Sequence, residues 1–289
     1  MSSYFTDRNG AFSQGYTDLA IERHRAARDA RGVEYTSREC EIGIWETVRI
    51  INTEGERCIG RPMGRYHTFN TGRLDRLSED EIDECCEEIA RKLCEVVDGL
   101  NCLPDRILIV GLGNAALTPD SIGPKSAHNV KPTLHIHDFD EGMFEALDCA
   151  EIAVLCPGVT SDTGVDSVEI VRGVSKRICP DVIIAIDAIA TVDEARLGST
   201  VQISDAGLHP GRGVGNSHLA LTEETIGIPI VSIGVPTVID SRAFRGEEDR
   251  GRAIADAMLV APREIDEITT VGARIIGGAI NQAFGITPY

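Results

Sequence analysis

The sequence contains no apolar run approaching the roughly twenty residues that a membrane-spanning helix needs, and its start, MSSYFTDRNGAFSQGYTD, lacks the apolar core of a signal peptide. We therefore expect a chain without a membrane span or an export signal. Basic residues are also scarce, because 28 lysines and arginines face 46 aspartates and glutamates, for a net charge of -18. Direct nucleic-acid binding needs a basic surface, so this charge argues against it. It favours a basic partner, although acidity is also common among cytosolic enzymes.

The nine cysteines include no Cys-x-x-Cys pair, and no other residue set has the firm spacing of a metal site. Reduced thiols in a cytosolic protein are the expected state. We predict no metal and no organic cofactor. No internal repeat or low-complexity segment divides the 289 residues, a length that one large domain can account for. The expected organisation is a polar tail over residues 1–16 and a single α/β domain over residues 17–289.

The first part of that domain has the pattern of β structure. Residues from about 33 to 70 alternate polar and apolar side chains, which predicts an antiparallel β segment with turns at Gly55, Gly60 and Gly64. Ser78 and Glu81 then have the spacing of a capping box, which predicts a helix. A last helix is expected from about Pro262, because proline suits the first helical position.

Five short apolar runs follow residue 105, and each ends at glycine, proline or aspartate: RILIVGLG, EIAVLCPG, DVIIAIDA, STVQISDAG and IPIVSIGV. Continuous apolar runs are typical of strands covered on both faces, and the stretches between them are long enough for helices. We therefore predict an α/β fold with a mostly parallel sheet flanked by helices. Sites in such sheets form outside the carboxyl ends of strands, so polar residues after these runs are candidates, and they could meet at one rim.

Two aspartates stand where a carboxylate is unusual. Asp120 follows Thr118-Pro119 at a predicted helix start, and Asp187 ends the apolar run of its strand. A helix N-terminus lowers the pKa of a carboxyl group, whereas apolar burial raises it. Two carboxyl groups separated in this way could act as general base and general acid in hydrolysis. A helix cap at Asp120 and a loop hydrogen bond at Asp187 would explain the same residues without catalysis.

Glycine-containing turns could supply the groups that bind substrate or stabilise an oxyanion. One turn follows the first apolar run, and the loop HPGRGVGN follows the fourth. Backbone N–H groups of such loops bind anions, although a simple tight connection explains them equally well. The candidates are Gly113, Asn114, Asp205, His209, Gly211 and Gly213.

Three other motifs fit known patterns less well. GLGNAA (residues 111–116) with Asp138 matches a dinucleotide fingerprint, but Pro119 would interrupt the helix that such a site requires. Asp162-Thr163-Gly164 spells the motif of pepsin-like proteases, yet it has no second copy and stands in an α/β chain. His135-x-His137, expected on a strand with both rings on one face, lacks firm partners for a metal.

Several blocks together resemble the germination protease family of endospore-forming bacteria. They appear in the order of that family and cover most of the chain from residue 17. The blocks are TDLAIE, VGLGN with LTPDSIGPK, PGVTSDTGVDS, PDVIIAIDAIA, TVQISDAGLHPGRGVGN, ETIGIPIVSIGVPTVID and APREID.

The resemblance implies a fold of the hydrogenase-maturation-protease type, a homotetramer, and an endopeptidase in the cytoplasm of the spore core. It implies that small acid-soluble spore proteins are degraded during germination by an atypical aspartic mechanism. The catalytic aspartates implied by the TPD and AIDA motifs are Asp120 and Asp187. A zymogen that trims its own N-terminus is also implied, with cleavage here between Asp18 and Leu19.

Two positions depart from the family. Arg212 replaces a serine of the family's glycine-rich loop, and only the 20 residues from Ser241 to Val260 stand where a long insertion is expected. Substrate range, zymogen control or oligomer contacts could differ as a result. Two rival functions stay open: a processing peptidase of the hydrogenase-maturation type, which uses carboxylates on nickel, and a non-catalytic binding protein that retains the fold.

Overall fold

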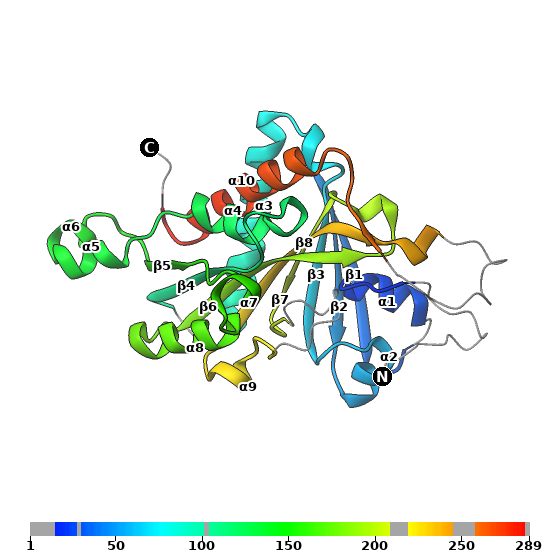
Figure 1. Cartoon of the computed structure of the whole chain (residues 1–289), viewed down its shortest axis with the longest axis horizontal. Coiled ribbons are helices and arrows are strands. Elements are labelled where there is room, and N and C mark those ends of the chain that lie inside the picture. The colour runs from blue at the N-terminus through cyan, green and yellow to red at the C-terminus, as the bar shows by residue number, and fades with distance from the viewer. Residues whose placement is uncertain (1–14, 28–29, 101–103, 209–218, 245–257, 287–289) are drawn as a thin grey trace.

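A computed structural model describes residues 15–27, 30–100, 104–208, 219–244 and 258–286. Within them, one mixed sheet has the strand order β1-β2-β3-β7-β8-β6-β4-β5, and β9 pairs with β8 (Figure 1). The strands are β1 (Val33–Cys40), β2 (Gly43–Ile50), β3 (Gly64–Asn70), β4 (Arg106–Gly111), β5 (Glu151–Leu155), β6 (Val182–Thr191), β7 (Thr200–Ser204), β8 (Ile230–Asp240) and β9 (Leu259–Val260). The helices are α1 (Ala20–Ala27), α2 (Thr53–Ile59), α3 (Glu79–Asp98), α4 (Ile122–Asn129), α5 (Leu134–Phe139), α6 (Glu141–Glu145), α7 (Thr160–Thr163), α8 (Ser167–Ile178), α9 (Glu223–Ile226) and α10 (Ile265–Ala283).

The parallel half of the sheet consists of β5, β4, β6 and β8. Its continuous apolar runs are covered on both faces, as predicted. Ile107, Ile109 and Ile184 pack in one cluster with α3, α4 and α10, whereas Leu108 and Ile183 pack in another with α8 (Figure 1). Successive side chains of a strand point to opposite faces, which is why one run feeds two cores. The predicted α/β fold, with a sheet flanked by helices, is confirmed.

The predicted N-terminal antiparallel segment is also confirmed, since β1, β2 and β3 pair antiparallel. Gly55, however, lies in α2 rather than in a turn. The Asn52 side chain accepts hydrogen bonds from the N–H groups of Glu54 and Gly55, which caps the helix. β7 is a further difference, because it runs antiparallel to both β3 and β8 and joins the two halves of the sheet.

The two longest helices, α3 and α10, pack against each other on one face of the sheet (Figure 1). Ser78 and Glu81 form the predicted capping box at the start of α3. α10 begins at Ile265 instead of at Pro262, and residues 263–264 form a turn before it. None of the helices in the described ranges combines the length and the apolar character needed to cross a membrane.

A buried ion pair connects the antiparallel strands to the rest of the molecule. Glu46 on β2 is 4% exposed, and Arg196, 5% exposed, donates to its carboxylate over 2.8 Å. Asn70, Arg25 and the Tyr35 hydroxyl donate to the same carboxylate. Burial alone would raise the pKa of Glu46, but the Arg196 guanidinium and the other donors hold it below its ordinary value. The negative charge is therefore fully compensated inside the protein.

His67 on β3 should make the protein sensitive to acid. It is 5% exposed, and burial, reinforced by Lys92 and Arg65 and opposed by Glu95, lowers its pKa to about 4. The unfolded chain binds a proton on this ring below pH of about 6.5, whereas the folded chain does so only near pH 4, so the free energy of unfolding falls as pH falls between these values. Relative to a His67→Asn variant, we expect an additional loss of up to ~3 kcal/mol. Urea unfolding from pH 7 to pH 4 measures it, and parallel curves for the two proteins would contradict it.

Candidate active site

The first candidate aspartate lies in the connection between β4 and α4. After Leu112 the chain turns at Gly113, whose φ of +108° favours glycine and where a Cβ would stand 2.1 Å from the Asp120 carbonyl oxygen. The Asn114 N–H donates to Asp120 Oδ2 over 2.7 Å. Asp120 closes a 3-10 turn, Thr118–Asp120, and does not cap α4 through its side chain. The tight turn therefore fixes the carboxylate against the end of β4.

The second candidate, Asp187, lies within β6 and not at its end. The neighbouring strand β4 pairs only as far as Ile186, while β6 continues along β8 to Thr191. Asp187 is thus the first residue of β6 beyond the carboxyl end of β4. Its Oδ1 accepts the Ala188 N–H over 2.9 Å. The prediction that Asp187 ends its strand is wrong, because β6 continues along β8 for four more residues, to Thr191.

The two carboxyl groups interact electrostatically. Burial raises the pKa of Asp187 well above its usual value, and the negative charge of Asp120 raises it further. Burial also raises the pKa of Asp120, while the Asn114 N–H favours its ionised form. The sequence interpretation of a lowered pKa at Asp120 is wrong, because burial outweighs the hydrogen bond from the Asn114 N–H. Because the pKa of Asp187 is raised more strongly than that of Asp120, Asp120 loses its proton first.

A third carboxylate stands close to this pair. The Asp18 N–H donates to the Ala190 carbonyl over 2.9 Å, and Asp18 Oδ2 accepts the Ala190 N–H over 3.0 Å. Arg61, 9% exposed, donates to Asp18 Oδ1 and to the Thr17 carbonyl. The charge of Asp18 adds to the raised pKa of Asp187. Sequence reasoning gave Asp18 only a cleavage role and missed Arg61, which no motif marks.

The N-terminal segment is fastened beyond Asp18 as well. Of the predicted tail, residues 1–14 lie outside the described residues, and the Tyr16 N–H donates to Asp240 over 2.8 Å. Leu19, Ala20 and Ile21 are buried in a cluster with β2 and β3. The expected cleavage bond between Asp18 and Leu19 is therefore held in place in this structure.

Of the other predicted substrate-binding residues, Asp205 is the one that the structure describes, and it does not lie at the pair. Asp205 follows β7, and because β7 is antiparallel it leaves the sheet at the end where β6 and β8 begin. Its carboxylate accepts the Arg65 N–H over 2.6 Å and braces the start of β3. The expectation that this strand end shares the rim with Asp187 is wrong. His209, Gly211, Gly213 and Arg212 lie outside the described residues.

The less favoured motifs have structural explanations. The GLGNAA turn leads into a loop and a 3-10 turn rather than a helix, which is not the dinucleotide-binding arrangement. Asp162 is exposed on α7. His135 and His137 lie on α5, so the strand expected there is wrong. Within the described ranges, no group of three or more histidine, cysteine, aspartate or glutamate side chains is arranged to hold a metal ion.

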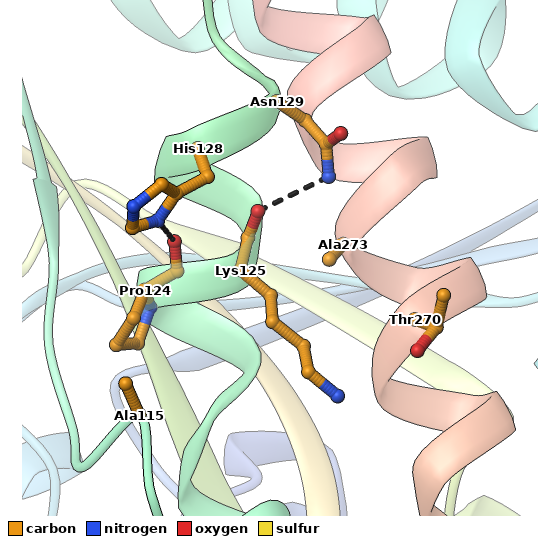
Figure 2. Close-up of a pocket in the computed structure, with 7 residues that line it drawn as sticks. All are labelled: Ala115, Pro124, Lys125, His128, Asn129, Thr270 and Ala273. Carbon is orange, nitrogen blue, oxygen red and sulfur yellow. Dashed lines mark hydrogen bonds between the residues drawn. The ribbon is translucent and has the colours of Figure 1, made fainter.

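A cavity of about 340 Å³ lies between α4 and α10, apart from the carboxyl pair (Figure 2). Its polar groups are already engaged. The Lys125 ammonium donates to Thr269, and the His128 and Asn129 side chains bond carbonyls of their own helix. We assign it no role. The lining residues are Ala115, Pro124, Lys125, His128, Asn129, Thr270 and Ala273.

Comparison with known proteins identifies the family of the chain. The sequence profile described as germination protease matches residues 16–247. The germination protease of Clostridium perfringens is 32% identical over 92% of this chain and 94% of its own length. The germination protease of Caldanaerobacter subterraneus subsp. tengcongensis is 38% identical over 78% of this chain and 69% of its own length. That of Priestia megaterium is 38% identical over 78% of this chain and 63% of its own length. Family members thus differ in how much of them the chain covers.

One solved structure is similar at a lower level, the NiFe hydrogenase maturation protease HycI from Thermococcus kodakarensis KOD1. It is 20% identical, covers 64% of this chain and 99% of its own, and superposes with a TM-score of 0.35. We draw nothing from a similarity at this level. The sequence profile and the relatives over most of the chain are sufficient: the chain belongs to the germination protease family, a family of peptidases.

Proposed function

We propose that this protein is an endopeptidase that degrades small acid-soluble spore proteins during germination, with Asp120 and Asp187 acting on a water molecule. The observation that carries the proposal is the pair itself: two carboxyl groups beyond the end of β4, both with a pKa raised by burial, and with the charge of Asp120 raising the pKa of Asp187 further. Perturbed carboxyl groups that meet at a strand end are the arrangement expected of general acid–base catalysis. Family membership supports the peptidase activity.

In the proposed reaction the two carboxyl groups divide the work. Asp120, which ionises first, takes a proton from water as the water oxygen attacks the carbonyl carbon of the peptide bond. Asp187, still protonated, gives its proton to the leaving nitrogen as the C–N bond breaks. The products are a new carboxyl terminus and a new amine, and the excess proton on Asp120 returns to Asp187 through solvent. No metal or organic cofactor takes part in this scheme.

An oxyanion donor belongs to the same proposal. The Asn114 N–H is already bound to Asp120, so it is unsuited to that role. Asn114 Oδ1 accepts the Ala116 N–H over 2.8 Å, which leaves the Nδ2 group as a donor for a substrate. We therefore assign substrate contact to the side-chain amide of Asn114 and to the Gly113 N–H rather than to the Asn114 backbone.

A digestion experiment tests the function. The purified chain is incubated with a small acid-soluble spore protein, with and without a chelator, and the fragments are identified by mass spectrometry. We expect internal cleavage in both samples. Cleavage that requires added nickel or zinc would favour the hydrogenase-maturation type of peptidase instead. Tight binding of the intact spore protein without cleavage would favour a non-catalytic binding protein.

Self-trimming is a separate expectation. Incubation at mildly acidic pH, where the pair retains a proton, should remove the residues up to Asp18 and leave Leu19 as the N-terminus. Because Leu19 is fully buried and Asp18 is tied to Ala190, trimming should be slow compared with cleavage of a spore protein. N-terminal sequencing measures it. A wild-type chain that keeps Met1, or an Asp187→Asn variant that trims equally fast, would rule self-processing out.

We further propose that the protein acts as a homotetramer in the cytoplasm of the spore core. The support is the family alone. Light scattering of the purified chain gives the mass directly, and a monomer at micromolar concentration would exclude the tetramer.

A further inference from the structure

One edge of β6 carries the feature from which this inference starts. Backbone groups of alternate residues in a strand point to the same edge. On the edge that faces β4, the Ile186 carbonyl accepts the Leu112 N–H, and the Ala190 carbonyl accepts the Asp18 N–H. Ala188 lies between these two covered positions and points to the same edge.

The backbone of Ala188 is only half occupied. Its N–H donates to the carboxylate of Asp187, which therefore lies over this edge. Its carbonyl accepts no hydrogen bond from any of the described residues, and the residue is partly exposed. A lone carbonyl acceptor beside a reactive carboxyl group is thus open to a ligand that brings an N–H donor.

The chain itself shows what kind of ligand this edge accepts. Residues 16–18 lie against the end of β6, and a main-chain N–H of that segment pairs with Ala190. Side chains hold it there, with Arg61 bound to Asp18 and Asp240 bound to the Tyr16 N–H. The same edge that seats this segment continues towards Ala188, one pair of residues closer to Asp187.

We propose that the substrate docks as an extended peptide on the open edge of β6, donating one backbone N–H to the Ala188 carbonyl. The proposal rests on the proposed endopeptidase function and adds the binding mode to it. Addition of a strand to a sheet edge is a general way to bind extended peptides, in which main-chain hydrogen bonds supply affinity independent of sequence. Here Leu112 and Asp18 limit the pairing to one residue, so the docked peptide bond is fixed in register with Asp187.

The test uses an uncleaved peptide of defined sequence. The probe is SQGYTDLAIER, residues 13–23 of this chain, which spans the expected self-cleavage bond, and the protein is the full-length Asp187→Asn variant. Each backbone amide near that bond is replaced in turn by an ester, which removes one N–H without adding bulk. We expect one ester to weaken binding about 5- to 10-fold in fluorescence anisotropy, the loss typical of a single hydrogen bond. The neighbouring esters serve as controls and should bind like the parent peptide.

A second measurement locates the contact. Labelling alanine with ¹³C at the carbonyl and isoleucine with ¹⁵N limits the spectrum to Ala–Ile peptide groups, and the Ala188–Ile189 signal is the one lost in an Ile189→Val variant. The peptide should change the ¹³C chemical shift of the Ala188 carbonyl. The chemical shift of the Ala185 carbonyl should stay unchanged, because Ala185 lies in the fully paired part of β6.

An unchanged chemical shift of the Ala188 carbonyl at saturating peptide, or equal binding of all esters, would overturn the docking mode. Cleavage by the wild-type chain is scored separately. If the wild type cleaves the peptide but the chemical shift of the Ala188 carbonyl does not change, the proposed function would stand without this binding mode. A wild type that binds with the Ala188 shift but never cleaves would leave the binding mode standing without the function.

Discussion

Replacing Asp187 by asparagine should lower the rate of peptide cleavage by about 10³-fold while the protein stays folded, since a positioned acid or base contributes on the order of 10²–10⁴. Asparagine keeps the acceptor for the Ala188 N–H and the size of the side chain, but it carries no titrating proton. Asp120→Asn should have a comparable effect. Initial rates of fragment formation from a spore protein, with circular dichroism to confirm folding, provide the measurement.

Stability supplies a second readout for the same variant. The folded chain holds a proton on Asp187 at pH values where the unfolded chain has lost it, because burial and Asp120 raise its pKa. This group therefore stabilises the fold only at low pH, and its contribution is lost as pH rises through the raised pKa. At neutral pH the Asp187→Asn variant should unfold no earlier than the wild type. Asp162→Asn, on the exposed α7, is the control and should change neither activity nor stability. A folded Asp187→Asn or Asp120→Asn variant with near-normal activity would refute the two-aspartate mechanism.

Replacing Arg196 by methionine should cost about 3–5 kcal/mol of unfolding free energy, the loss typical when one partner of a buried ion pair is removed. Methionine fills much of the volume but leaves the 4%-exposed Glu46 with a charge that Arg196 no longer balances. Arg25 and Tyr35 still donate to Glu46, but Arg25 is largely exposed and shields the charge less well. Urea denaturation at pH 7 measures the change.

Arg49→Met is the matched control for that experiment. Arg49 pairs with Glu34 at the exposed surface of the same β segment over 3.3 Å. An exposed pair of this kind contributes no more than about 1 kcal/mol, so the variant should remain close to the wild type. Equal losses for Arg49→Met and Arg196→Met would show that burial does not determine the strength of these pairs.

The sequence predicts the parallel core well because the signal is local. An unbroken run such as VIIAI can be stable only where both faces of a strand are covered, and the Ser78–Glu81 capping box needs only neighbouring residues. The direction of β7 could not be predicted in the same way. Its run, TVQIS, is less apolar than the others, but strand direction depends on which neighbours it meets, here β3 and β8.

The same distinction applies to the candidate site. Asp120 and Asp187 stand out because each interrupts a local pattern. The pKa of Asp120 was wrongly expected to fall, because the burial that raises it comes from segments distant in sequence. Arg61 was missed for a similar reason, since its partner Asp18 lies 43 residues earlier and the two meet only in the folded chain.

Gly111 and Gly123, beside the carboxyl pair, fix the distance between α4 and the strands β4 and β6. A Cβ at Gly123 would lie 2.1 Å from the Leu112 carbonyl oxygen and 2.5 Å from that of Ile186, and a Cβ at Gly111 would lie 2.5 Å from the Gly123 carbonyl oxygen. The start of α4 therefore rests directly on the main chains of β4 and β6, with no side chain between them. Core side chains can change and repack without altering this backbone contact. One methyl group added at either glycine would instead push α4 away from the strands and move Asp120 relative to Asp187. We consequently expect the protein to tolerate many substitutions at the apolar residues around the site and almost none at Gly111 and Gly123.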